Sequence, residues 1–132
     1  MKGGCHCQAI RYAIAQSTLS DVANCHCSIC RRTSGGTFMT WATVDLGSFS
    51  WEKGVPAQYR ATPESERYFC RSCGAQLAMH TLMAPGTLDV VVATLDAPEL
   101  FAPNRNIWVG SKLPWVVLEE SLPQEEEEFL GE

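Results

Sequence analysis

The chain has 132 residues and a formal net charge of −5 at pH 7, with 45% hydrophobic and 19% charged residues. This size and composition are those of one globular domain, and they exclude a wholly disordered chain. Its apolar runs, such as residues 88–95, are too short to span a bilayer, and the first residues lack the apolar centre of a signal peptide, so we expect a cytoplasmic protein.

The first predicted elements are a strand and a short helix. Residues 9–15 place Ile10, Tyr12 and Ile14 on one face, because the side chains of a strand alternate with a period of two. Residues 28–34 are the one segment whose pattern predicts a helix, and it is short.

The rest of the chain predicts further strands. Residues 37–44 are rich in aromatic and β-branched side chains, which favour strands. Residues 58–60 and 66–69 predict the two arms of a hairpin around a threonine–proline turn, and residues 88–95 predict a buried strand. We therefore expect a mostly-β fold whose modest core is reinforced by bound metal.

The acidity of the chain is concentrated at its end. Residues 119–132 carry seven acidic side chains, whereas the first 118 residues carry 8 acidic and 10 basic ones. We expect a zinc-binding domain over residues 1–122 and an acidic tail over 123–132, with the run Glu125–Glu128 solvated and frayed. The chain has no broad basic face, which argues against a zinc-ribbon protein that binds nucleic acid.

Seven cysteines dominate the chemistry that the sequence offers. They form three close groups, which are Cys5 and Cys7, then Cys25, Cys27 and Cys30, then Cys70 and Cys73. An odd number cannot pair completely into disulfides, and a reducing compartment disfavours disulfides. Close spacing lets sulfur atoms converge to about 2.3 Å from one zinc ion, and Gly74 permits the turn that follows the last group.

Counting ligands separates two kinds of site. The two doublets together supply four thiolates (the cysteine quartet: Cys5, Cys7, Cys70 and Cys73), which is typical of a closed structural zinc site. The triplet supplies three (the cysteine trio: Cys25, Cys27 and Cys30) and leaves a coordination position open, as in catalytic zinc sites. The alternatives are seven buried free thiols, or one zinc with a trio that binds nothing.

The residues beside the cysteines have two interpretations. His6 and His26 lie between cysteines, but alternation along an extended chain turns them to the opposite face, so we expect neither to bind metal. Arg31 and Arg32 follow the trio and either offset thiolate charge or bind a substrate carboxylate. Backbone N–H groups of Gly35 and Gly36 either approach a bound anion or only form a turn.

Three stretches make the chain recognisable: GGCHCQAIRY at residues 3–12, CHCSICRRTSGGTF at 25–38 and FCRSCGAQL at 69–77. Residues 94–103 (TLDAPELFAP) and 107–115 (IWVGSKLPW) match less closely. With these motifs the chain resembles the glutathione-dependent formaldehyde-activating enzyme (Gfa) family. Gln8 departs from the pattern, since the family often has glycine there.

The resemblance implies a fold, two zinc ions and an activity. In that family the first and last cysteine groups share a structural zinc and the middle group holds a catalytic one, which corresponds here to the quartet and the trio. It implies a β-tent-like fold of stacked antiparallel sheets, and a carbon–sulfur lyase that joins a thiol such as glutathione to formaldehyde. The implied partners are a small thiol and a small aldehyde, with no nucleic acid and no membrane. The alternative is a zinc-stabilised binding or scaffold module without catalysis.

Overall fold

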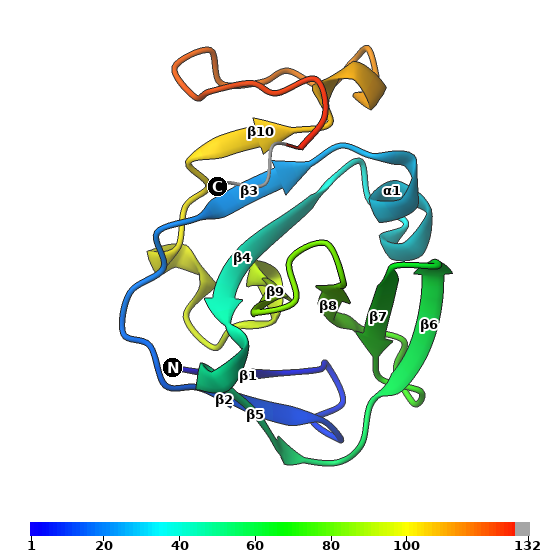
Figure 1. Ribbon diagram of the computed structural model, residues 1–132, viewed down its shortest axis with the longest axis vertical. Coiled ribbons are helices and arrows are strands. Elements are labelled where there is room, and N and C mark those ends of the chain that lie inside the picture. Colours follow the sequence, from blue (N-terminus) through cyan, green and yellow to red (C-terminus); the bar gives the residue numbers. More distant parts are fainter. Residues whose placement is uncertain (129–132) are drawn as a thin grey trace.

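The computed structural model describes residues 1–128, which form two β-sheets and one α-helix (Figure 1). The smaller sheet has the strand order β1 (Lys2–Gly4), β2 (Arg11–Ile14), β5 (Phe49–Lys53). The larger sheet has the order β10 (Arg105–Ile107), β3 (Val22–Cys25), β4 (Met39–Asp45), β9 (Thr87–Val91), β8 (Gln76–Thr81), β7 (Ser65–Phe69), β6 (Ala57–Thr62). Short 3₁₀ turns occupy Leu46–Ser48, Val92–Thr94, Pro98–Leu100 and Val109–Ser111.

The mostly-β prediction is confirmed, with one correction to the strand directions. The expected fold has only antiparallel sheets. In the seven-stranded sheet five of the six neighbouring pairs are antiparallel, but β10 pairs with β3 in parallel, so this sheet is mixed. The parallel pair arises because the long connection after β9 returns the chain to the free edge of β3.

The main core lies between the two sheets. Ile10, Tyr12 and Ile14 are buried on one face, as their alternation predicts, and the Tyr12 ring stacks on Phe49 with centroids 5.2 Å apart. The same cluster contains Ala42 and Val44 of β4, Leu88 and Val90 of β9, and two cysteines, Cys5 and Cys70. The larger sheet thus presents every second side chain to the smaller sheet.

The other face of the larger sheet carries a second, smaller cluster. It contains Trp41 from β4 and Val91 from β9, together with Cys25 and Cys30. Side chains alternate along β4 and β9, so adjacent residues point to opposite faces of the sheet. One face packs in the main core and the other packs around the cysteine trio.

Helix α1 spans Ser28–Ser34, which confirms the predicted helix. It begins at Cys27, whose Sγ accepts a hydrogen bond from the Cys30 backbone N–H at 3.3 Å. It ends at Gly35, where φ is 73°, a left-handed conformation that glycine adopts without strain. The helix is short because a capping side chain and a glycine enclose only about two turns of chain.

Two other strand predictions have different outcomes. The hairpin is confirmed, since β6 and β7 pair antiparallel. The strand over residues 88–95 is too long, because β9 ends at Val91, where Thr94 donates to the Val91 carbonyl and the chain turns. This turn brings Leu95 to a bridge with Gly3, which joins the two sheets.

The acidic end of the chain folds back along β10. The Glu125 N–H donates to the Asn106 carbonyl and the Asn106 N–H donates to the Pro123 carbonyl, both at 2.9 Å. Arg105 forms ion pairs with Glu125 and Glu128. The expectation of a frayed end is therefore wrong for Glu125–Glu128, because β10 offers an unpaired backbone edge and a basic side chain, although Glu126 and Glu127 are exposed to solvent as expected. The division of the chain at residue 122 stays a prediction.

Candidate metal centres and active site

The cysteine quartet joins the two sheets. Cys5 and Cys7 lie in the turn after β1, and Cys70 and Cys73 lie in the turn between β7 and β8. The Cys7 Sγ lies 3.7 Å from the sulfur atoms of both Cys5 and Cys70. The first C-x-C segment is a turn rather than the extended chain that we expected, since the Gln8 N–H donates to the Cys5 carbonyl and Gln8 has a φ of 65°.

Backbone N–H groups support these sulfur atoms. The Ile10 N–H donates to Cys5 Sγ at 3.2 Å, and the Cys73 N–H donates to Cys70 Sγ at 3.5 Å. Hydrogen bonds from backbone N–H groups, with that of Cys7 the strongest, lower the pKa of the Cys73 thiol to about 6. Gly74, with φ at 79°, closes the turn as the sequence predicts.

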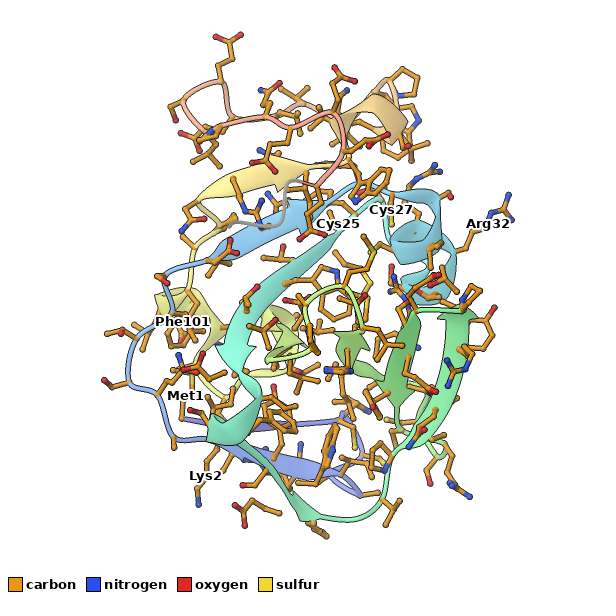
Figure 2. The ribbon with its side chains drawn as sticks, viewed as in Figure 1. Met1, Lys2, Cys25, Cys27, Arg32 and Phe101 are labelled. Atoms are coloured by element: carbon orange, nitrogen blue, oxygen red, sulfur yellow. The ribbon has the colours of Figure 1, made fainter. Side chains whose placement is uncertain are left out.

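The cysteine trio lies where β3 ends and α1 begins (Figure 2). Cys25 is the last residue of β3, Cys27 precedes the helix and Cys30 is in its first turn. Cys25 and Cys30 are buried and Cys27 is half-buried. Side-chain hydrogen bonding with Cys25 and then Cys30 lowers the pKa of the Cys27 thiol well below its usual range, whereas hydrogen bonding with Cys27 and Cys30 raises the pKa of the Cys25 thiol.

Both groups fit zinc. A tetrahedral site with bonds of about 2.3 Å places its sulfur atoms about 3.8 Å apart, close to the 3.7 Å separations in the quartet. In each group all ligand atoms lie within 4.8 Å of one another, and within residues 1–128 neither group includes a histidine or a carboxylate. Thiolate donors favour zinc over magnesium or calcium. The quartet can saturate a tetrahedral ion and the trio cannot.

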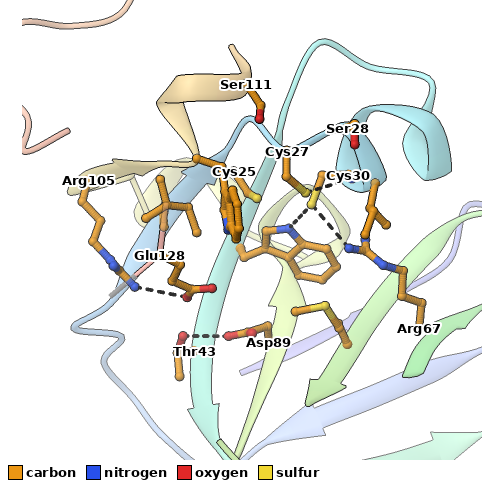
Figure 3. Close-up of a pocket in the computed structure, with 16 residues that line it drawn as sticks. Cys25, Cys27, Ser28, Cys30, Thr43, Arg67, Asp89, Arg105, Ser111 and Glu128 are labelled. Carbon is orange, nitrogen blue, oxygen red and sulfur yellow. Dashed lines mark hydrogen bonds and ion pairs between the residues drawn. The ribbon is translucent and has the colours of Figure 1, made fainter. Parts of the chain in front are cut away.

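A cavity of about 260 Å³ opens beside the trio and not beside the quartet (Figure 3). Its lining includes all three cysteines, Trp41, Arg67 and Trp108. A second hollow of about 320 Å³ adjoins it and shares Thr43, Met79 and Asp89. Together they form a groove over the outer face of the larger sheet, with the trio at one end.

The register of the sheet explains the floor of this groove. Arg67 of β7 is opposite Met79 of β8, Met79 is opposite Asp89 of β9, and Asp89 is opposite Thr43 of β4. Because directly opposed residues point to the same side of a sheet, these four side chains form one row across four strands. Residues spread over positions 43 to 89 thereby line one groove.

Arg67 contacts the trio directly. It is only 4% exposed, and its Nη2 donates to Cys30 Sγ at 3.6 Å while its Nη1 donates to the Thr33 hydroxyl at 3.3 Å. The guanidinium also lies over the Trp41 ring, 5.6 Å from the centroid. Trp41 Nε1 donates to the same Cys30 sulfur at 3.4 Å. Two side-chain N–H groups thus converge on one candidate ligand (Figure 3).

Carboxylates line the part of the cavity away from Arg67. Asp89 accepts a hydrogen bond from Thr43 at 2.7 Å, and Glu128 pairs with Arg105 at 3.6 Å (Figure 3). Burial raises the pKa of Asp89. Burial, followed by repulsion from Asp89, raises the pKa of Glu128 to about 7. Glu128 can therefore hold or release a proton near neutral pH.

The four residues predicted to bind substrate lie elsewhere. Arg31, Arg32, Gly35 and Gly36 do not line the cavity, whose described arginines are Arg67 and Arg105. The helix explains this, since residues one and two positions after Cys30 are rotated away from it around the axis. Arg32 extends from the outer side of α1 (Figure 2).

His26 has structural contacts. Its side chain is buried, lies at a tilt to the Phe38 ring and hydrogen-bonds through Nε2 to the Asn106 side chain at 3.1 Å. Burial lowers its pKa, which favours the neutral form. It helps to hold the end of β3 against β10.

Sequence reasoning missed the charged residues of the cavity, which are Arg67, Arg105, Asp89 and Glu128. Alternation within β9 could have shown that Asp89 shares a face with the buried Val91, but only strand register places Asp89 in one row with Arg67 of β7. For Trp41 and Trp108 the signal was ambiguous, because aromatic side chains in a small β-domain usually belong to the core.

The comparisons with known proteins agree with this geometry. The family model described as glutathione-dependent formaldehyde-activating enzyme (GFA) matches residues 1–111, so the chain belongs to this family. The class of protein is thus a Gfa-type domain with two cysteine clusters that can each hold a metal ion.

Individual relatives are distant. A Halomonas elongata protein, provisionally named as a glutathione-dependent formaldehyde-activating enzyme, is 26% identical over 90% of this chain and 81% of its own. An uncharacterised lyase of Schizosaccharomyces pombe is 33% identical over 58% of this chain and 54% of its own. A crystal structure of a Rhodobacter sphaeroides protein superposes with a TM-score of 0.64 at 28% identity, over 78% of this chain and 97% of the other.

Within residues 1–128, no helix has the length and apolarity needed to cross a membrane.

Proposed function

We propose that the protein is a zinc-dependent carbon–sulfur lyase that makes or breaks a bond between a thiol and a small aldehyde, in the cytoplasm. The observation that carries this proposal is the asymmetry of the two cysteine groups. The trio provides three ligands and lines a cavity, whereas the quartet provides four and lies outside it. Three protein ligands beside a cavity are the arrangement that leaves room for a substrate ligand.

In the proposed mechanism the trio holds the catalytic zinc and the quartet holds a structural one. When bound, zinc supplies Lewis acidity, which lowers the pKa of a thiol at the open position. Trp41 and Arg67 hold the Cys30 sulfur in place through their N–H groups. Trp108 and Met79 line the cavity and exclude water from part of it.

The addition needs one proton to move. The thiol sulfur forms a bond to the aldehyde carbon, its proton leaves, and the carbonyl oxygen gains a proton, which gives a hemithioacetal. The carboxylate of Glu128 has a pKa of about 7 and lines the same cavity, so it can accept the first proton and return it. Cleavage of the carbon–sulfur bond follows the same steps in reverse.

Glutathione is the thiol that the family name suggests. Arg31 and Arg32, with the N–H groups of Gly35 and Gly36, are proposed to contact the carboxylates of such a larger thiol outside the cavity. This assignment depends on the charge of the arginines and their place directly after the trio.

The test is to mix the zinc-loaded protein with glutathione and formaldehyde and follow hemithioacetal formation by exchange NMR. We expect exchange faster than the uncatalysed reaction, and a Cys27→Ser variant at the background rate. Exchange at the background rate for the unaltered protein would contradict the glutathione reaction. A protein with one inert zinc and no exchange with any thiol would favour the scaffold-module alternative.

A further inference from the structure

Arg67 is a buried cation without a carboxylate partner. Within residues 1–128 no ion pair involves Arg67, whereas Arg11, Arg60 and Arg105 each pair with an acid. Its Nε–H has no hydrogen-bond partner in the same part of the chain. Burying a charge without compensation is costly, so the guanidinium requires a negative group nearby.

Among residues 1–128, the only hydrogen-bond partner of Arg67 that can carry a negative charge is the Cys30 thiol. Nη2 donates to Cys30 Sγ, and the other contacts are the Thr33 hydroxyl and the face of Trp41, neither of which carries a full charge. The position of Arg67 is therefore explained if Cys30 is a thiolate. Cross-strand pairing with Met79 fixes this position from the far side of the groove.

The charge balance gives this contact a consequence. Three thiolates and one divalent ion carry a net charge of −1, which the guanidinium cancels. A fourth ligand that is itself an anion then brings the cluster to −1 rather than −2, in a half-enclosed site where repulsion is strong. The quartet reaches −2 by itself, but Cys7 and Cys73 are exposed, so solvent screens that charge.

We infer that Arg67 is a positioning residue that adapts the cysteine trio to accept an anionic fourth ligand, so that the site selects thiolates and small soft anions over water. This inference rests on the proposed function for its substrate, a thiol. It assigns a role in that function to a residue of β7, far in sequence from the trio. Two N–H donors on Cys30 also reduce the electron density that this sulfur gives to a metal, which strengthens binding of the fourth ligand.

The experiment uses the full chain loaded with Co²⁺, whose sulfur-to-metal absorption bands report each added thiolate. Arg67→Met keeps most of the side-chain volume but removes the positive charge. Arg67→Lys keeps the charge but loses the two-pronged guanidinium group. The control is Arg60→Met, on the exposed strand β6. The probes are 2-mercaptoethanol and thiocyanate, titrated from pH 6 to 9.

We expect Arg67→Met to weaken binding of both probes by about tenfold or more and to move the onset of thiol binding to higher pH. Arg67→Lys should recover part of the affinity, and Arg60→Met should match the unaltered protein. A purely structural role would lower the melting temperature of Arg67→Met and leave both dissociation constants unchanged, which would overturn the inference. If Arg67→Met does not fold, an unchanged dissociation constant in both Arg67→Lys and Arg67→Gln would overturn it as well.

The two probes separate this inference from the proposed function. Binding of thiocyanate that depends on Arg67, without binding of any thiol, would support the role of Arg67 and contradict the lyase. Binding of thiol with catalysed exchange, and with equal affinity in Arg67→Met, would support the lyase and overturn the role of Arg67. Failure of the unaltered protein to bind either probe would overturn both.

Discussion

The two cysteine groups have the same ligand chemistry but different surroundings. The quartet is built from two turns, with backbone N–H groups as its nearest donors, and it fastens the smaller sheet to the larger one. The trio is built at a junction of strand and helix, has two side-chain N–H donors in addition to the backbone N–H of Cys30, and faces a cavity. Backbone donors are fixed by the fold, whereas side-chain donors can be altered one at a time. This difference is the reason why we propose a structural role for the quartet and a catalytic role for the trio.

The largest expected effect comes from breaking the quartet. Cys5 is buried in the core between the sheets, and Cys5→Ser removes a ligand there. A structural zinc contributes on the order of 10–16 kcal/mol, comparable with the whole stability of a domain, so we expect the variant to be largely unfolded at 25 °C. Circular dichroism and metal analysis would measure this, with His6→Ala as the control. A folded Cys5→Ser protein that keeps one zinc in the trio would refute the structural role.

The second effect separates chemistry from folding. Cys27→Ser should abolish exchange between thiol and aldehyde and lower the melting temperature by no more than about 5 °C, because Cys27 is half-buried and outside the core between the sheets. Scanning calorimetry and exchange NMR on the same sample would measure both. Equal decreases in melting temperature in Cys27→Ser and Cys5→Ser would show that the two cysteine groups do not have separate structural and catalytic roles.

A smaller effect comes from removing one donor to the trio. Trp41→Phe keeps the ring but deletes the N–H that reaches Cys30 Sγ. We expect zinc affinity at the trio to fall about fivefold, the equivalent of a hydrogen bond worth about 1 kcal/mol, with no change at the quartet. Competition with a chelator would measure it. Trp51→Phe, in the smaller sheet, is the matched control, and equal losses in the two variants would contradict a specific contact.

The last effect, which changes stability alone, is a pH dependence at the acidic end of the chain. The pKa of Glu128 is about 7 in the folded protein and 4.5 in the reference state, so folding binds its proton more tightly. The shift favours the folded state fully below pH 4.5, where Glu128 is protonated in both states. This contribution is lost as the pH rises to about 7, because the unfolded chain ionises first. The melting temperature of the unaltered protein should therefore fall relative to Glu128→Gln between pH 5.5 and 7 and run parallel above that. Parallel curves throughout would show that Glu128 is not buried as described.

The sequence predicts some of these features because their causes are local. Cysteine spacing identifies the ligand groups, and alternation along residues 9–15 identifies the buried face of that strand. The helix over residues 28–34 follows from a short segment that ends in glycine. Each of these signals lies within a few residues, so no knowledge of the sheet is needed.

The cavity depends on causes that are not local. Arg67 and Asp89 face the same cavity as the trio because of the pairing of β7, β8 and β9, and a change of register by one residue would turn them to the opposite face. The path of residues 123–128 depends on the free edge of β10, a product of the parallel pairing with β3. The net charge of the acidic segment predicted a solvated end, because net charge does not show that Arg105 lies beside the edge of β10 and pairs with Glu125 and Glu128.

The alternating strands of the larger sheet also bear on how new specificities can arise in this scaffold. Positions 43, 79 and 89 face the groove, while positions 42, 78, 88 and 90 face the core, so the two sets can be mutated independently. A combinatorial library confined to Thr43, Met79 and Asp89 should diversify ligand preference while most of its members still fold. Natural drift at the same three positions offers an evolutionary route from one reactant to another without passing through an unstable intermediate.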